Sequence, residues 1–213
     1  MRIKWLGHSA FLITSDTGKR IITDPYAPGE NIHYGEIKES ADIVTTSHAH
    51  FDHNNAAAVS GNPEVVRGTT EVKGTKFRGI PTYHDKNAGK DRGSNTIFNF
   101  EVDGMKVCHL GDLGHPLSDK QAAELGKVDI LLIPVGGFYT IDAAVASLIC
   151  DQLKPRIVIP MHFKTEKLDF PITGVDEFLK GKKDISQPNA NEAIFKSGEL
   201  PANTRVIVLK PAL

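Results

Sequence analysis

Four residues of types that commonly bind metal ions lie within six consecutive positions of the chain. The segment Ser47–His53 contains them in the pattern H-x-H-x-D-H. Neutral imidazole nitrogens and a carboxylate are favourable ligands for zinc and for similar divalent ions. A polar loop that is rich in histidine by chance is the alternative, and the density of candidate ligands argues against it. The segment therefore predicts a metal site.

The spacing within this segment divides the four residues into two pairs. Alternate residues of a chain that leaves a strand point the same way, so His48 and His50 can share one metal ion. Asp52 and His53 are offset from that pair and enter the next element, where they can face a second ion nearby. Four residues do not complete two metal sites, so we expect further ligands from other parts of the chain.

Three further residues of ligand type lie just beyond segments that are expected to be extended. They are His84, Asp112 and His162. Loops at the ends of a rigid sheet commonly carry functional residues. Each of the three, taken alone, is more typical of a structural hydrogen-bonding residue. Together with the H-x-H-x-D-H segment, they indicate two adjacent metal sites.

Short apolar runs, most of them followed by turn signals, predict the strands that must position these residues. The expected strands are Arg2–Leu6, Ala10–Thr14, Arg20–Thr23, Asp42–Thr46, Glu64–Arg67, Thr75–Ile80, Thr96–Val102, Met105–Leu110, Val128–Pro134, Arg156–Pro160 and Thr204–Leu209. The expected helices are Asn54–Val59, Asp119–Leu125, Asp142–Leu153 and Val175–Leu179. Strands dominate the first half and helices alternate with strands in the second, which predicts stacked sheets with helices outside.

The composition excludes several classes of protein. The chain has 213 residues, and 25 Lys and Arg against 26 Asp and Glu leave no basic excess for nucleic acid or an anionic membrane. This length predicts one full domain whose core needs no disulfide. Cys108 and Cys150 lie in apolar segments and are expected to be buried free thiols. No signal peptide or membrane span is apparent, which predicts a soluble, cytoplasmic protein.

These motifs give the sequence a resemblance to the metallo-β-lactamase superfamily of metal-dependent hydrolases. Within it, the chain resembles the branch near the L-ascorbate-6-phosphate lactonase-like proteins. The segments that carry the resemblance are Gly7-His8-Ser9, Thr23-Asp24-Pro25, Ser47–His53, Tyr83-His84-Asp85, Arg92–Thr96, His109–His115, Pro134–Gly137 and Pro160-Met161-His162. The resemblance implies an α+β fold, a four-layer αββα sandwich with metal ions at the edges of the sheets. We expect residues 1–213 to form one such domain.

The resemblance also implies a role for each candidate ligand. For the first metal ion the implied ligands are His48, His50 and His84, and for the second they are Asp52, His53 and His162. Asp112 would bridge the two ions, and Asp24 would orient a ligand histidine from outside the ligand set. Two divalent ions are expected, with Zn²⁺ favoured and Mn²⁺ or Fe²⁺ as alternatives.

The implied chemistry is hydrolysis. A metal-bound hydroxide would exist at neutral pH and attack a carbonyl or phosphoryl centre, and Asp52 could also accept a proton. Two divalent ions, two carboxylates and a hydroxide leave about one positive charge, which suits a small anionic substrate such as a lactone or phosphoester. A di-iron redox protein and a noncatalytic metal-binding protein on the same fold are the alternatives. A homo-oligomer is compatible with the sequence.

Other residues near these motifs carry less specific signals. His115 could act as a catalytic residue by donating a hydrogen bond to substrate, or it could cap local backbone. Arg92 could bind an anion or be solvated at the surface. His8 could lie near the metal ions, reaching them from an N-terminal hairpin. The polar C-terminal segment 164–213 could be solvated or could flank the active site as a flap.

Overall fold

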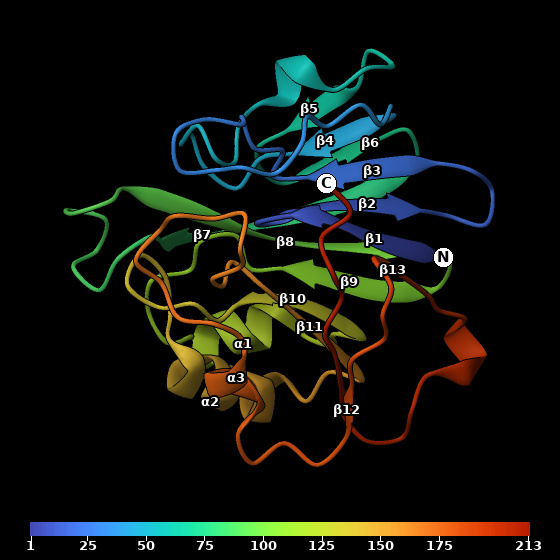
Figure 1. Cartoon of the computed structure of the whole chain (residues 1–213). Coiled ribbons are helices and arrows are strands. Elements are labelled where there is room, and N and C mark those ends of the chain that lie inside the picture. The colour runs from blue at the N-terminus through green and yellow to red at the C-terminus, as the bar shows by residue number, and fades with distance from the viewer.

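Two β-sheets packed face to face form the centre of the molecule, which the computed structural model describes over residues 1–213 (Figure 1). The strands of the first sheet are β1 (Arg2–Gly7), β2 (Ala10–Thr14), β3 (Arg20–Thr23), β4 (Ile43–Thr45), β5 (Glu64–Val66) and β13 (Glu192–Ile194). They are arranged in the order β13-β1-β2-β3-β4-β5.

The second sheet contains both antiparallel and parallel neighbours. Its strands are β6 (Thr70–Val72), β7 (Thr75–Tyr83), β8 (Ser94–Val102), β9 (Met105–His109), β10 (Ile130–Pro134), β11 (Ile157–Met161), β12 (Ile185–Ser186) and β14 (Arg205–Ile207). Their order is β12-β14-β11-β10-β9-β8-β7-β6. The sheet is therefore mixed, with β9, β10, β11, β14 and β12 parallel and a meander of hairpins at the other end.

Three α-helices lie on the outer side of the second sheet (Figure 1). They are α1 (Asp119–Leu125), α2 (Ala143–Leu153) and α3 (Asp176–Leu179). The start of α1 has the predicted capping box, in which the Ser118 hydroxyl accepts a hydrogen bond from the Gln121 backbone N–H and the Gln121 side chain accepts one from the Ser118 backbone N–H. The cap fixes the helix start independently of the core.

The outer side of the first sheet is covered by loops and one short helical turn. The α-helix expected at Asn54–Val59 is wrong, because only a 3-10 turn, η1 (Ala56–Ala58), forms there, and Asn55 makes no side-chain cap. A second 3-10 turn, η2 (Ser197–Glu199), lies near the C-terminus. One turn without a cap lacks the hydrogen bonds that would propagate an α-helix.

Alternate residues of the first sheet face two different cores. Trp5 and Phe11 point toward the second sheet and belong to a cluster of 42 buried hydrophobic residues. Leu6 and Ala10 belong to a separate cluster of 13, in which Tyr34 and other loop residues cover the outer face. The covering loops are therefore anchored by their own core.

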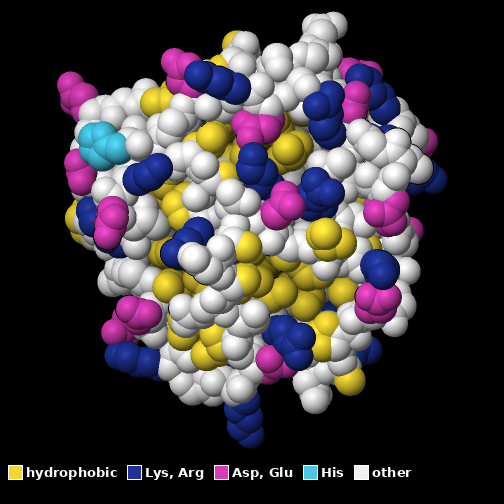
Figure 2. Space-filling view, turned by 45° about the vertical axis from the view of Figure 1, so that its right-hand side comes forward, with side chains coloured by type: hydrophobic (Ala, Val, Ile, Leu, Met, Phe, Trp, Pro, Cys, Tyr) yellow, Lys and Arg dark blue, Asp and Glu magenta, His cyan; other side chains and the backbone are white.

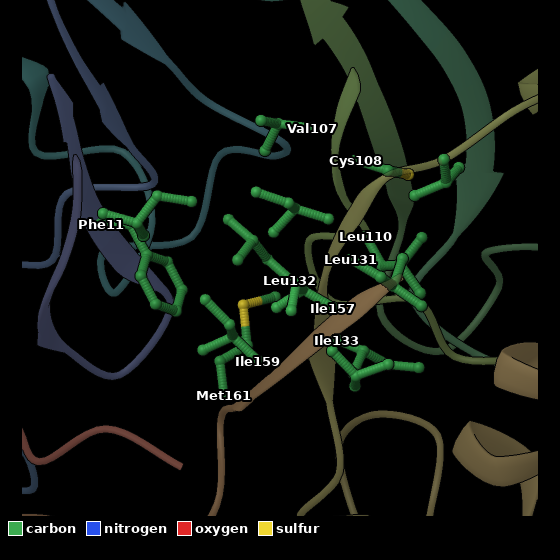
Figure 3. Packing of buried hydrophobic residues seen from close by; sticks show 14 of the residues in the cluster. Phe11, Val107, Cys108, Leu110, Leu131, Leu132, Ile133, Ile157, Ile159 and Met161 are labelled. Atoms are coloured by element: carbon green, nitrogen blue, oxygen red, sulfur yellow. The ribbon is translucent and has the colours of Figure 1, made fainter. Parts of the chain in front are cut away.

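The central parallel strands are buried on both faces. Figure 3 shows Val107, Leu132 and Ile159 on the side of Phe11, between the sheets, and Leu131 on the opposite side, beneath the helices. Near-continuous apolar runs are typical of such strands. This two-sided packing gives the second sheet the rigidity that a functional edge requires.

The segment 164–213 contributes strands to both sheets. β13 pairs antiparallel with β1, and β14 pairs parallel with β11. β14 lies within the predicted strand Thr204–Leu209, whereas β12 and β13 are not anticipated by the sequence pattern. The segment is therefore an integral part of the sandwich and no mere solvated loop.

The strands that precede the candidate ligands all end at one edge of the sandwich. In the first sheet, β1 and β3 run the same way because both are antiparallel to β2, and β4 is parallel to β3. In the second sheet, β7, β9 and β11 also share one direction. Chain segments that leave these six strands can therefore converge at that edge.

Charged side chains are mixed on the face shown in Figure 2, where Lys and Arg lie among Asp and Glu without a field of one sign. This mixture agrees with the formal net charge of −1. None of the helices could span a lipid bilayer, since the longest, α2, has 11 residues. Both cysteines are free and buried, as predicted.

Candidate metal centre

His48, His50 and His84 bring ring nitrogens together at the ends of β4 and β7. One nitrogen from each lies within 4.8 Å of the other two, and His48 Nε2 is 3.1 Å from His50 Nδ1. Ligands about 2.1 Å from a tetrahedral ion are about 3.4 Å apart, so this spacing fits one shared ion. The three residues form what we call the three-histidine site, in which His50 is exposed.

A second group lies deeper at the same edge. His8, Asp52, His53 and His162 place one ligand atom each within 4.8 Å of the others, and all four side chains are buried. His53 Nε2 is 3.6 Å from Asp52 Oδ2. We call this group the buried site. It contains the three predicted ligands of the second ion and, in addition, His8 from the β1–β2 turn.

Asp112 lies between the two sites. Its Oδ2 is 3.1 Å from His84 Nε2 and 3.2 Å from both His53 Nε2 and His162 Nε2. Burial alone would raise the pKa of this carboxyl, but the charges of His162 and His53 hold it well below its ordinary value. The Asp112 backbone N–H donates to Asn95 Oδ1 at 2.9 Å, which fixes the loop. A carboxylate in this position can contact ions in both sites.

One buried carboxylate outside the two groups orients a histidine in each of them. Asp24 accepts a hydrogen bond from His53 Nδ1 at 2.8 Å, which leaves His53 Nε2 free as a ligand atom. The Ser47 hydroxyl also donates to Asp24 and lies 2.9 Å from His48 Nδ1. Such partners fix the tautomer and the direction of a metal-binding ring. Asp24 therefore has the orienting geometry that the family resemblance implies.

The donor atoms of the cluster have the chemistry of metal ligands. His53 Nε2 and Asp112 Oδ1 are buried and have no hydrogen-bond partner. An unpaired buried polar atom is costly, and a metal ion is one partner that removes the cost. Burial also lowers the pKa of His48 to about 3, which keeps its ring in the neutral form that binds metals. Imidazoles with two carboxylates suit zinc and similar divalent ions.

A cavity of about 450 Å³ opens onto both sites. Its wall includes His50, His84, Asp52, His162 and Asp112. Beyond the cluster it is lined by Asn31, Phe51, Asp91, Arg92, Tyr139 and Phe170. Phe170 comes from the C-terminal segment, so part of that segment does flank the cavity. A substrate in this cavity would contact both groups of candidate ligands.

Arg92 is the only lysine or arginine that lines this cavity. Its guanidinium lies 4.9 Å from the centroid of the Tyr139 ring and forms no ion pair with an acidic side chain. The neighbouring Asp91 carboxylate accepts a hydrogen bond from the Asn87 amide. The cationic edge of Arg92 is therefore available to a ligand.

Asp85 fixes the loop that carries Arg92. Its two carboxylate oxygens accept four backbone N–H hydrogen bonds, from Asn87, Gly89, Asp91 and Arg92, at 2.7 to 3.0 Å. These bonds, opposed by partial desolvation, lower the pKa of Asp85 to about 2. The only sequence signal for Asp85 is its position directly after His84. A carboxylate that accepts hydrogen bonds from loop backbone produces no spacing pattern in the sequence.

The structure does not bring His115 to the cluster. Its Nε2 accepts a hydrogen bond from the Tyr83 backbone N–H, and its Nδ1 lies 2.8 Å from the Pro116 carbonyl oxygen. With both ring nitrogens bonded to local backbone and the ring outside the cavity wall, His115 has the geometry of a backbone cap. This arrangement gives no support to the predicted catalytic role.

A sandwich of two mixed sheets, with a His/Asp cluster where the strands end, defines the metallo-β-lactamase fold. A family model described as "Beta-lactamase superfamily domain" matches residues 2–162. The chain belongs to this superfamily and, within it, to the UPF0173 metal-dependent hydrolases. The predicted fold is therefore confirmed, with few helices in its outer layers.

Individual relatives match over most of their length. The chain is 31% identical to a UPF0173 metal-dependent hydrolase of Thermococcus onnurineus, with 94% of this chain and 98% of the relative covered. A solved structure from Thermotoga maritima, provisionally assigned as a Zn-dependent hydrolase of the same superfamily, is 40% identical. Its TM-score is 0.81, with 98% of this chain and 97% of that chain covered. These relatives support a metal-dependent hydrolase and do not single out the lactonase-like branch.

Proposed function

We propose that the protein hydrolyses a small anionic substrate at a carbonyl or phosphoryl centre, with a lactone or a phosphoester as the favoured class. The observation that carries the proposal is the cavity itself. It is lined both by residues of the two metal-binding groups and by the unpaired Arg92 guanidinium. Substrate could therefore contact the metal centre and a fixed cation together.

The chain offers a complete ligand set for two divalent ions. His48, His50 and His84 would hold one ion, Asp52, His53 and His162 would hold the other, and Asp112 would contact both. Bound there, two divalent ions would lower the pKa of a coordinated water to roughly 7 and polarise the substrate's electrophilic oxygen. Zinc is the ion that this donor set favours.

Asp52 is the residue best placed to move a proton during the reaction. It belongs to the buried site and also lines the cavity. Burial by itself would raise the pKa of the Asp52 carboxyl. The charge of His53 and the hydrogen bond from His8 outweigh burial and hold this pKa below its ordinary value. An ionised carboxylate at the cavity wall can accept a proton from water and return it to a leaving group.

Arg92 would hold the anionic end of the substrate. The guanidinium lies over the Tyr139 ring, and Asp85 holds the backbone of the loop that carries Arg92. A planar guanidinium recognises a carboxylate or a phosphate through paired N–H donors. Phe51 and Phe170 add apolar surface to the same cavity. We therefore expect a substrate with an anionic group at a distance from the bond that is cleaved.

The test is a panel of lactones, phosphodiesters and thioesters, each with and without a remote carboxylate or phosphate, assayed after reconstitution with Zn²⁺. We expect the anionic members to be preferred. Arg92→Met should raise KM for them by about 10- to 100-fold, because a charge-assisted hydrogen bond contributes about 1.5–3 kcal/mol. Arg92→Lys keeps the charge without the planar fork and should give an intermediate KM. A metal-loaded protein that turns over no member of the panel, or full activity after metal removal, would contradict the proposal.

A further inference from the structure

His8 occupies the turn at the end of β1, at the same edge as the proposed metal ligands. Its side chain has no exposed surface. Its Nε2 lies 3.2 Å from Asp52 Oδ2, and its ring centroid is 4.3 Å from that of His162. The 3.2 Å spacing is close to the 3.1 Å between His48 Nε2 and His50 Nδ1 in the three-histidine site. His8 therefore has the spacing of a ligand that shares an ion with its neighbours.

The backbone around His8 is held in a conformation that turns this ring inward. His8 has a φ of +52°, in the left-handed region that few residues other than glycine adopt. Its carbonyl oxygen accepts hydrogen bonds from Trp5 Nε1 at 3.0 Å and from the His162 backbone N–H at 3.2 Å. Gly7 precedes it with a φ of +134°, and a Cβ there would lie 2.7 Å from the Tyr34 ring. Strained backbone of this kind clusters at functional sites.

The strain is shared by other residues of the cluster. Of the nine residues other than glycine that have a positive φ, three lie at this cluster, namely His8, Asp24 and His162. A left-handed backbone conformation thus positions His8, the proposed ligand His162 and Asp24, whose carboxylate orients His53. Three independent features, namely burial, spacing and backbone conformation, place His8 with the metal-binding residues.

We infer that His8 is a further protein ligand of the buried site, in addition to Asp52, His53, His162 and the shared Asp112. The inference rests on the proposed assignment of Asp52, His53 and His162 as ligands of one ion, and it extends that assignment. With Asp112 counted in both sites, His8 would give the buried site five protein ligands and leave the three-histidine site with four. A site filled by protein ligands is typically closed and retains its metal. The ion in the buried site is therefore held more tightly. The three-histidine site, with fewer protein ligands and the exposed His50, keeps more room for water or substrate.

The competing interpretation is that His8 only donates a hydrogen bond to Asp52 and so orients it. A glutamine can still donate such a bond but provides no imidazole nitrogen, so His8→Gln separates the two roles. His33→Gln is the matched control, because His33 Nε2 also contacts an aspartate, Asp169 Oδ2 at 2.7 Å, on the exposed surface outside both sites.

The experiment measures Co²⁺ binding by chelator competition and the visible spectrum of the bound Co²⁺. Wild type and His33→Gln should bind two equivalents, one of them more tightly. His8→Gln should weaken the tighter equivalent by more than about 100-fold, beyond the loss expected for an orienting partner, and change its spectrum. A smaller loss with an unchanged spectrum would show that His8 only orients Asp52 and would overturn the inference.

A second measurement keeps the test decisive if His8→Gln fails to fold. Nitrogen NMR of the imidazoles of the wild-type protein follows a Zn²⁺ titration. The coordinated nitrogen of His8 should shift with the first equivalent, and an unshifted His8 would overturn the inference. Failure of the wild type to bind two ions would instead count against the proposed function, so the two failures are distinguishable.

Discussion

The three-histidine site and the buried site are built by the same rule but differ in enclosure. Both take their residues from segments that follow strands ending at one edge of the sandwich. The first has an exposed member, His50, whereas every member of the second is buried. Two sites that arise from one edge can thus have different access to solvent.

The two sites differ in solvent exposure because different parts of the chain surround them. In the buried site, the His8 ring is covered by Phe170, which it meets edge-on with 5.7 Å between the ring centroids. The three-histidine site draws on β4 and β7, which end beside the cavity mouth. Under the proposed assignment, the buried site would retain its ion and the three-histidine site would exchange ligands during turnover.

The largest effect should come from the one residue that the two sites share. Asp112→Ala removes the carboxylate that contacts His84, His53 and His162, so both ions should be lost together. We expect a fall in kcat/KM of at least about 10³-fold, because the metal-derived electrostatic stabilisation disappears. Metal content after gel filtration is the second readout. Two retained equivalents would show that the sites do not depend on Asp112.

A pair of orienting variants should separate the sites. Asp24→Asn disturbs His53 directly and His48 through Ser47, so it should weaken metal binding at both sites by about 10- to 100-fold. Ser47→Ala removes only the contact to His48 and should weaken the three-histidine site alone. Metal stoichiometry against free Zn²⁺ measures both. Equal effects of the two variants on both sites would mean that the sites are not independently supported.

Much of the frame could be predicted from the sequence. The bounds of β2 and β3 match the predicted strands, because short β-branched runs between turn signals are the strongest strand pattern. β12 and β13 could not be predicted, since two or three partly polar residues carry no period and form strands only through their neighbours. Their pairing is a product of tertiary structure.

The candidate site was predictable where residues lie close together in sequence. His48 and His50 stand out by spacing alone, and Asp112 and His162 by their places after apolar runs. His8 gave only a weak signal, because a single histidine in a turn has no spacing pattern. Its distance to Asp52 is set by the tertiary structure, since β2 and β3 separate β1 from β4 in the sheet. A sequence pattern does not identify residues whose role depends on contacts with residues far away in the chain.

The smallest effect should come from the loop that faces the open side of the cavity. Asp85→Asn weakens the four backbone hydrogen bonds that hold the loop of Arg92, since an amide offers one oxygen where the carboxylate offers two. We expect KM for an anionic substrate to rise by roughly 3- to 10-fold, a loss of about one neutral hydrogen bond, with kcat and metal content unchanged. Arg92→Met in the same background should then add less than it does alone, because the two residues act through one guanidinium. If the Asp85 variant instead lost metal from the three-histidine site, the loop would be supporting His84 as well, and the open site would depend on its surroundings as strongly as the buried one does.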